Sequence, residues 1–457
     1  MCMIISMRTS TLERFDKEIC GTVWTSPHAR ELLDSICYDF GTRPCASKGF
    51  RGAQQRVGGV LRKLGATKVH TEKVPVLAWR PGGSQVEILG RKARALDHIQ
   101  CPHSAAATVT APVVDAGLLT AEDLDDLGGK AEGAILLYQG HAGYKPKMQP
   151  PWNRVPDAQR RGAVGAINRS LYPGSGPEIQ QVAVDRTVSM PVVSISREQG
   201  FELAALVREG KVKAKIETTG RTVKSQCSNL VADFGPARKT EEMIVITAHL
   251  DCHHNSTGAL DNLSGVVTIL EILRALAPMR AKFRRHLRIA IFTCEEYGYS
   301  GSRQYVKQHA DELDRVRLDF NFDCIFPETG RGVAVMWSPV MRDVIEAALG
   351  QTQCRVEVQN HFCQSSDYLS FMTAGVPAAR AADLWDSFPP NRMHTRYDTP
   401  DRIPTEWIRL NAMPFAQMLL RLLLDPKPLP AVRNSPEEVR ALYEQEGIGD
   451  ALRIFDL

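Results

Sequence analysis

Apolar residues recur at helical spacing in several stretches of the chain. Residues 53–64 are apolar at 57, 60, 61 and 64 and end before Gly65, a residue that often follows a helix. Residues 263–276 carry apolar side chains at 263, 266, 267, 270, 273 and 276. This spacing predicts amphipathic helices over 53–64 and 263–276, and a further helix is expected near 302–313.

Short apolar runs alternate with these helices in the second half of the chain. Strands are predicted at 68–76, 244–248, 289–294 and 318–322, and near 333 and 356. From about residue 228 to 424 strand follows helix in turn, which predicts an α/β fold with a mostly parallel sheet and helices on both faces. In such sheets ligands bind beyond the carboxyl ends of the strands.

The pattern changes between about residues 108 and 221. Brief β-prone runs at 134–138 and 190–195 flank a helix of small residues predicted over 157–164, and segments rich in proline and glycine separate them. We interpret this stretch as a small β-rich insertion. The predicted division is 1–103 for the N-terminal part of the catalytic domain, 104–222 for the insertion, 223–426 for the catalytic domain and 427–457 for a C-terminal tail.

Composition and charge narrow the classes of partner. The 457 residues are 43% hydrophobic and carry a net charge of only +4, without a dense basic patch, so no nucleic-acid partner is expected. The longest apolar run, near 418–424, is too short to span a bilayer, so no membrane association is expected. The N-terminal apolar patch is shorter than a signal-peptide core, which predicts a cytoplasmic protein.

The eleven cysteines lack paired spacing, as expected of reduced thiols rather than a disulfide framework. Cys252, Cys294 and Cys324 each lie next to or near a carboxylate that we single out below. A redox or metal role is one interpretation of these three. The other is that they are small apolar residues filling space at the ends of buried strands.

Two adjacent glutamates, Glu295 and Glu296, follow the predicted strand that ends at Cys294. Two carboxylates at one strand end repel each other unless a positive charge lies between them. A metal ion fits this position, because one carboxylate can bind it while the other handles a proton.

Further metal-competent residues follow the other strands. His249 and Asp251 come directly after one strand, Asp261 precedes the helix over 263–276, Asp323 follows another strand, and His394 lies in a late loop. Each has an ordinary explanation alone; Asp261, for example, could cap the helix. Together they place two imidazoles and several carboxylates at one edge of one sheet, which predicts a metal centre.

Counting ligands favours two zinc ions per chain, each with about three protein contacts. In this assignment His249 and Asp323 hold one ion, Glu296 and His394 hold the other, and Asp261 bridges both. Asp251 would then orient the His249 ring by accepting its second N–H. Glu295 remains free to act as the general base that takes the proton of a metal-bridging water.

In order and spacing these residues resemble the M28 (aminopeptidase Y-like) family of dizinc metallopeptidases. The resemblance covers about residues 229–424 and includes Ser366-Asp367-Tyr368 and Ala374-Gly375-Val376-Pro377. It implies a three-layer α/β/α zinc-exopeptidase-like catalytic domain with a mixed, mostly parallel sheet. All five ligand positions and the catalytic glutamate are present, which implies a working hydrolase.

The insertion is similar to a protease-associated (PA) domain. The similarity rests on three runs, 133–137, 159–166 and 190–195. Such domains are thought to cover or restrict an active-site cleft, and the alternative is a structural spacer.

One departure from the family concerns the residue before the last histidine ligand. Some relatives have a tyrosine there that steadies the oxyanion, and this chain has Met393. Tyr368, Tyr397 and Arg396 are candidates to replace it, or the metal alone must serve. The neighbouring His253 and His254 could touch the cleft or lie in a solvated loop.

The candidate substrate pocket is less well marked. Trp385 and Phe388 precede His394 and could wall a side-chain pocket, with Tyr368 and Arg396 as further substrate-binding candidates. Packing within the core or the loops is the alternative for each of these residues.

The predicted function is that of a zinc-dependent exopeptidase, in first place an aminopeptidase, acting on a peptide or amide substrate. The first alternative is a carboxypeptidase or an amidohydrolase for blocked or unusual amides, to which arginines near the pocket, such as Arg380, would be suited. The second alternative is a non-catalytic binding module on the same scaffold. The oligomeric state is left open by the sequence.

Overall fold

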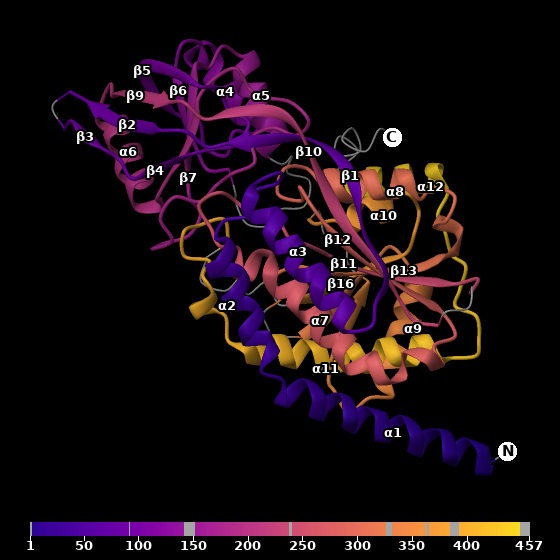
Figure 1. Ribbon diagram of the computed structural model, residues 1–457. Helices are drawn as coiled ribbons and strands as arrows, with labels where there is room; N and C mark the ends of the chain where they lie inside the picture. The colour runs from indigo at the N-terminus through magenta and orange to yellow at the C-terminus, as the bar shows by residue number, and fades with distance from the viewer. Residues whose placement is uncertain are drawn as a thin grey trace.

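The computed structural model describes residues 2–90, 92–140, 151–236, 240–325, 331–360, 362, 365–383 and 393–447. Two eight-stranded sheets dominate these residues and lie in separate parts of the molecule (Figure 1). The larger part carries most of the helices, and the smaller part is the β-rich unit expected from the sequence.

The first sheet is mixed, with parallel strands at its centre. β12, β11, β13 and β16 are parallel to one another, whereas β10 joins antiparallel on one side and β14 on the other. In spatial order its strands are β1 (Thr67–Arg80), β10 (Arg221–Phe234), β12 (His286–Phe292), β11 (Met243–His249), β13 (Val316–Phe322), β16 (Ala378–Asp383), β14 (Arg331–Met336) and β15 (Glu357–Asn360).

Helices cover both faces of this sheet, which confirms the predicted α/β/α layers (Figure 1). Residues of β11 alternate between the two layers: Ile244 and Ile246 pack in the larger core cluster, and Val245 packs in a cluster on the opposite face. The helices on the larger core are α1 (Cys2–Thr25), α2 (His28–Phe40), α3 (Lys48–Lys63), α7 (Gly265–Leu276), α9 (Pro339–Gly350) and α11 (Thr405–Leu424). Those on the other face are α8 (Ser300–Gln308), α10 (Tyr368–Thr373) and α12 (Pro436–Gln445).

The second sheet belongs to the insertion. Its spatial order is β3 (Arg94–Ala95), β2 (Ser84–Leu89), β9 (Lys213–Thr218), β5 (Ala107–Asp115), β6 (Ile135–Tyr138), β7 (Gly165–Arg169), β8 (Val192–Ile195) and β4 (His98–Gln100). Three helices pack on it: α4 (Ala121–Leu127), α5 (Pro151–Arg160) and α6 (Arg197–Glu209). Short turns of 3-10 helix span Gly128–Ala131, Ala277–Lys282, Leu313–Arg315 and Pro400–Arg402.

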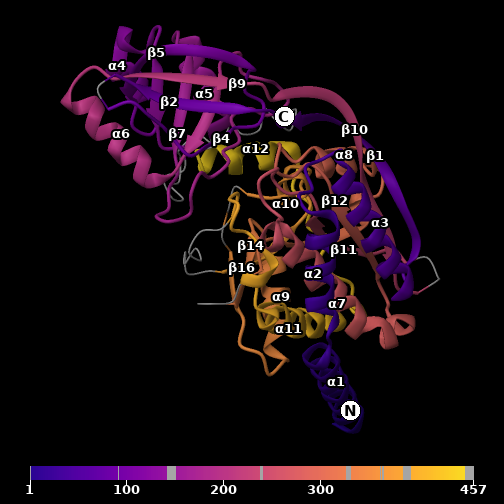
Figure 2. The same ribbon diagram turned by 60° about the vertical axis from the view of Figure 1, so that its left-hand side comes forward.

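The long antiparallel strands β1 and β10 connect the two parts (Figure 2). The chain leaves the first sheet at Arg80, enters the second sheet at Ser84 and returns through Arg221, which pairs with Arg80. The second sheet therefore begins about twenty residues before the predicted boundary at 104, because β2, β3 and β4 pair within it. The N-terminal segment assigned to the catalytic domain includes these three strands.

Most predicted elements are confirmed, with changed ends. The helix predicted over 53–64 is α3, and the one over 263–276 is α7. The helix predicted over 157–164 is wrong in position: α5 ends at Arg160 and Gly162 follows with a positive φ of 86°. Part of the predicted tail is ordered helix, since Tyr443 of α12 is buried and pairs with Thr373 at 2.8 Å. Among the described residues no helix has the length and apolarity of a membrane span.

Asn262 ties the start of α7 to the end of β13. Its side-chain nitrogen donates to Phe322 O at 2.9 Å, and its side-chain oxygen accepts from the backbone N–H groups of Gly265 and Cys324 at 3.1 and 3.2 Å. These hydrogen bonds leave no room for a side chain at Gly265, where an added Cβ would overlap Phe322 O and Asn262 Oδ1. The contact fixes Asp261 beside Asp323.

Replacing Gly265 with alanine should therefore destabilise the protein. Overpacking of a tight contact typically costs about 1–3 kcal/mol, and urea unfolding measures it. The control is Gly59→Ala in α3, where a Cβ meets nothing within 4 Å. That change should be neutral or stabilise by up to about 1 kcal/mol, because alanine favours helix over glycine. Equal stability of the two variants would contradict the close contact between Gly265 and the end of β13.

Candidate metal centre

Three adjacent parallel strands end at the same edge of the first sheet. β11 ends with His249, which pairs with Phe292 at the end of β12, and β13 ends at Phe322. The residues that follow, Asp251, Glu295 with Glu296, and Asp323, are consequently gathered in one place. The sheet topology, rather than any local motif, produces this convergence.

The His249 ring faces three carboxylates. Its Nε2 atom lies 3.2 Å from Asp261 Oδ1, 3.4 Å from Asp323 Oδ1 and 3.8 Å from Glu295 Oε2. Its Nδ1 atom lies 3.1 Å from the backbone carbonyl of Asp251. Because a carbonyl only accepts, Nδ1 carries a proton, and Nε2 is the ring atom that faces the carboxylates and could bind a metal ion placed among them.

A second histidine approaches the same aspartate from the other side. His394 Nε2 lies 3.1 Å from Asp261 Oδ2 and 3.4 Å from Glu296 Oε2. Asp261 thus presents one oxygen to His249 and the other to His394, as a bridging carboxylate does. We call His249, Asp261 and Asp323 the His249 site, and Asp261, Glu296 and His394 the His394 site.

Both sites suit a divalent metal. The side chains of the His249 site are at most 12% exposed, and His249 Nε2 and Asp323 Oδ1 form no hydrogen bond within the described chain. Buried polar atoms of this kind are normally satisfied. Imidazole nitrogens and carboxylate oxygens a little over 3 Å apart are the donor set and spacing of tetrahedral zinc ligands, roughly 3.3 Å apart for bonds of about 2.0 Å.

The charges of the site act strongly on one another. Burial raises the pKa of Glu295 well above its ordinary value; the charge of His249 opposes this shift, and Asp323 and Glu296 add to it. Burial would lower the pKa of His394, but Glu296 and Asp261 raise it to about 10. The carboxylates therefore make a strongly negative pocket that attracts cations.

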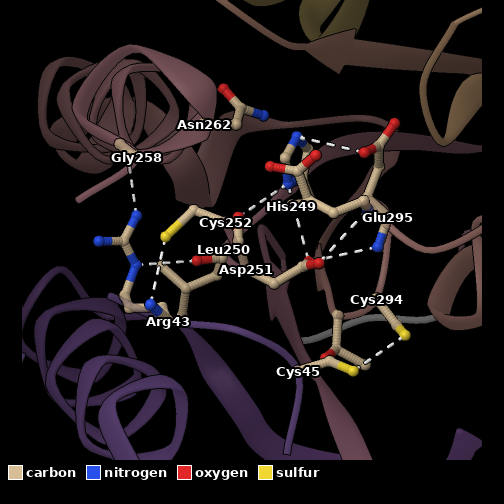
Figure 3. Close-up of polar contacts among 12 residues, drawn as sticks. Arg43, Cys45, His249, Leu250, Asp251, Cys252, Gly258, Asn262, Cys294 and Glu295 are labelled. Atoms are coloured by element: carbon tan, nitrogen blue, oxygen red, sulfur yellow. Dashed lines mark hydrogen bonds and ion pairs between the residues drawn. The ribbon is translucent and has the colours of Figure 1, made fainter. Parts of the chain in front are cut away.

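Asp251 supports the two glutamates. Its carboxylate accepts the backbone N–H groups of Glu295 at 3.3 Å and Glu296 at 3.4 Å, and lies 3.7 Å from His249 Nδ1 (Figure 3). Directly beneath, the thiols of Cys294 and Cys45 lie 3.1 Å apart in the buried core. Cys324 groups with Asp261 and Asp323 at the other side of the site.

Arg43, which the sequence analysis missed, clamps the loop between Asp251 and Asp261. It is fully buried and donates to the backbone carbonyls of Leu250 at 2.9 Å and Gly258 at 3.0 Å, and also to that of Thr257 (Figure 3). Its own N–H group contacts Cys252 Sγ. One buried cation thus holds a ligand-bearing loop and places a positive charge behind the carboxylates.

Asp398 is a second positioning residue that was missed, although it stands in the motif around His394. Its carboxylate oxygens accept the backbone N–H groups of Leu260 at 2.7 Å and Asp261 at 3.1 Å. The sequence signal available for this role was the presence of an aspartate four residues after His394. It fixes the backbone of the bridging ligand.

His253 also belongs to the site. Only 1% of it is exposed, and its Nε2 atom lies 3.0 Å from Glu296 Oε2. The interpretation of this residue as part of a solvated loop is wrong. Its neighbour His254 instead packs against Trp79, with ring centroids 6.3 Å apart.

The substrate-binding candidates are dispersed. Tyr368 is fully buried and its hydroxyl accepts the N–H of Ser365 at 3.1 Å. Arg396 forms a two-pronged ion pair with Asp97 of the insertion at 2.9 and 3.0 Å. Met393 packs against the larger core cluster. Trp385 and Phe388 lie outside the described residues.

The insertion contacts the loops that carry the ligands. Ile179 N donates to the carbonyl of His394 at 3.0 Å, and the Gln181 side chain donates to the carbonyl of Glu296 at 3.1 Å. Asp185 pairs with Arg303 of α8 at 2.6 Å. The segment from Ile179 to Asp185 is thereby anchored beside the His394 site.

Comparisons with known proteins agree with this architecture. Residues 229–418 match the model of peptidase family M28. Carboxypeptidase Q of Mus musculus is 25% identical over 369 residues, 77% of this chain and 76% of that protein. Aminopeptidase YwaD of Bacillus subtilis is 26% identical over 309 residues, 64% of this chain and 62% of that protein. The structure of BSAP, a zinc aminopeptidase from Bacillus subtilis, matches with a TM-score of 0.70 at 22% identity, covering 89% of this chain and 98% of that one.

An α/β/α fold with histidines and carboxylates at the ends of its parallel strands is the arrangement expected of a metallopeptidase. The matched segment contains every predicted ligand and Glu295. Residues 229–418 match peptidase family M28, the family that the sequence motifs resemble.

Loss of the Arg43 clamp should destabilise the fold. Arg43→Ala removes the buried cation that donates to three backbone carbonyls, and hydrogen bonds to charged groups contribute about 1.5–3 kcal/mol each. We expect a loss of roughly 3 kcal/mol or more in urea unfolding. The matched control is Arg56→Ala, whose pair with Asp39 is exposed and should cost about 1 kcal/mol or less. Similar losses of stability in both variants would contradict the role of Arg43 in holding the loop between Asp251 and Asp261.

Proposed function

We propose that the protein is a zinc-dependent aminopeptidase that holds two metal ions per chain. The observation that carries this proposal is the excess of buried carboxylate at the site. Beyond the ligands, Glu295, Asp251, Asp367 and Asp398 surround it. With the ligands Asp261, Glu296 and Asp323 they make seven carboxylates, against the five positive charges of two divalent ions and Arg43. A substrate bearing an ammonium group is therefore favoured over one bearing a carboxylate.

The nearby arginines among the described residues are engaged elsewhere, which supports the same choice. Arg396 is paired with Asp97, and Arg380 donates to Ser365 Oγ at 3.0 Å. Arg43 contacts backbone carbonyls on the far side of the ligand loop. A carboxypeptidase needs a cation that faces the substrate carboxylate, and each of these three already has another partner.

The donor sets described above support one assignment of the metal ligands. His249 and Asp323 hold one ion, Glu296 and His394 the other, and Asp261 both, as the opposite facing of its two oxygens supports. Bound zinc ions supply Lewis-acid polarisation of the scissile carbonyl and favour deprotonation of water. The protein's own contribution is to hold these donors in buried, fixed positions.

Glu295 acts as the general base in this proposal. Its carboxylate lies farther from His249 Nε2 than those of Asp261 and Asp323, at 3.8 Å, so it borders the site without filling a ligand position. Asp251 fixes its backbone. From there Glu295 takes a proton from the attacking water and passes it to the leaving amine.

Carboxypeptidase activity is the second candidate, because carboxypeptidase Q is among the relatives. Three substrates separate the two candidates: an aminoacyl anilide with a free amine, its N-acetyl derivative, and an N-acyl dipeptide with a free carboxylate. We expect hydrolysis of the free-amine anilide alone. Cleavage confined to the N-acyl dipeptide would identify a carboxypeptidase and exclude an aminopeptidase.

Glu295→Gln should keep the metals and lose turnover. Removal of a general base costs a factor of roughly 10² to 10⁴ in kcat, while metal analysis should still find two ions per chain. Asp261→Asn is the contrasting variant, and it should lower the occupancy of both ions. A Glu295→Gln variant with near wild-type kcat would show that another group is the base, and a wild-type protein that binds no zinc would favour a non-catalytic module.

A further inference from the structure

We propose that His253 is a fourth ligand of the His394 site, beside Asp261, Glu296 and His394, and that this site is consequently richer in nitrogen than the His249 site. The inference rests on the proposed two-metal function. It concerns a residue that the ligand assignment from sequence left out.

The donor atoms converge on one point. His253 Nε2 lies 3.0 Å from Glu296 Oε2, the same oxygen that lies 3.4 Å from His394 Nε2. The three donor atoms lie within 4.8 Å of one another. Donors that share one tetrahedral zinc ion lie roughly 3.3 Å apart for bonds of 2.0–2.1 Å, and both distances to Glu296 Oε2 are close to this value. Two imidazoles and one carboxylate form an ordinary zinc donor set.

The ring of His253 is held in place for this role. It packs edge-on against the His394 ring, with centroids 4.4 Å apart and planes at 90°. On its other side Tyr297 lies at 5.6 Å. The backbone that precedes it is held by Arg43, which donates to the carbonyl of Leu250 and accepts the N–H of Cys252. A ligand fixed before the ion arrives loses little entropy on binding.

Two observations argue that His253 does more than pack at the surface: its burial, and its contrast with the neighbouring His254. His253 is 1% exposed, and its Nδ1 atom has no hydrogen-bond partner among the described residues. His254, next in the chain, forms no ion pair with a carboxylate there and packs on Trp79 instead. Only the first of the two histidines is aimed at the metal centre.

The two sites should then differ in preference for metals. The His249 site offers one nitrogen with the carboxylates of Asp261 and Asp323, and the His394 site offers two nitrogens with those of Glu296 and Asp261. Imidazole donors favour zinc, cobalt, nickel and copper over magnesium and manganese. The His394 site should therefore bind zinc or cobalt more tightly than the His249 site does.

The alternative is that His253 only donates a hydrogen bond to Glu296. His253→Gln separates the two roles, because the glutamine amide can still donate near the position of Nε2 but is a poor zinc ligand. Removing a residue that only hydrogen-bonds to a metal ligand costs about 10–100-fold in metal affinity. Because glutamine can still donate to Glu296, His253→Gln should cost less than this if His253 is only a hydrogen-bond donor.

The experiment is a Co²⁺ titration of metal-free protein, followed by visible absorption and calorimetry. The wild type should take up two ions in two phases, with the tighter phase weakened at least about 100-fold in His253→Gln and the other phase unchanged. His254→Gln is the matched control and should titrate as the wild type does. Circular dichroism of the metal-free variants checks that each is folded.

Two other outcomes would overturn the assignment in distinguishable ways. Unchanged affinity for both ions in His253→Gln would show that His253 is at most a hydrogen-bond donor, and the proposed function would stand. A wild-type protein that takes up no Co²⁺ or Zn²⁺ would remove the two-metal function and the role of His253 together.

Discussion

The structure depends on burying several like charges at one edge of a sheet. Parallel strands β11, β12 and β13 end side by side, and each is followed by a carboxylate. Carboxylates a few ångströms apart and shielded from water repel each other strongly, and taking them out of water is itself costly. The remaining features of the site are arrangements that offset this cost.

Three kinds of partner offset the cost of burying these carboxylates. Backbone N–H groups bind the carboxylates of Asp251 and Asp398, so that these two charges also hold the backbone of Glu295, Glu296 and Asp261. Arg43 adds one buried positive charge and uses its donors on backbone carbonyls. The histidines face the carboxylates that remain. Divalent cations would complete this balance, and binding them only in the folded state would also stabilise the fold.

The sequence was sufficient to predict the site residues that directly follow strands. His249, Glu295, Glu296 and Asp323 were recognisable because each stands where an apolar run ends, and strand–helix alternation brings such ends to one edge. Arg43 and His253 carry no such local signal: Arg43 meets Gly258 across 215 positions, and His253 meets Glu296 across 43. The start of the insertion was misplaced for the same reason, since β2 is recognisable as part of the second sheet only by its pairing with β9, more than 120 residues later.

His394 shows why the insertion is part of the site. This residue has a φ of +58°, a left-handed conformation that costs a non-glycine residue about 1–2 kcal/mol. Its carbonyl accepts two hydrogen bonds, from Ile179 N in the insertion at 3.0 Å and from the Asn255 side chain at 3.2 Å. Two residues later Arg396 pairs with Asp97, again in the insertion. Hydrogen bonds from both parts of the molecule hold this backbone, so the insertion contributes to keeping His394 in its strained geometry. The second sheet therefore helps to set the geometry of the metal centre as well as flanking it.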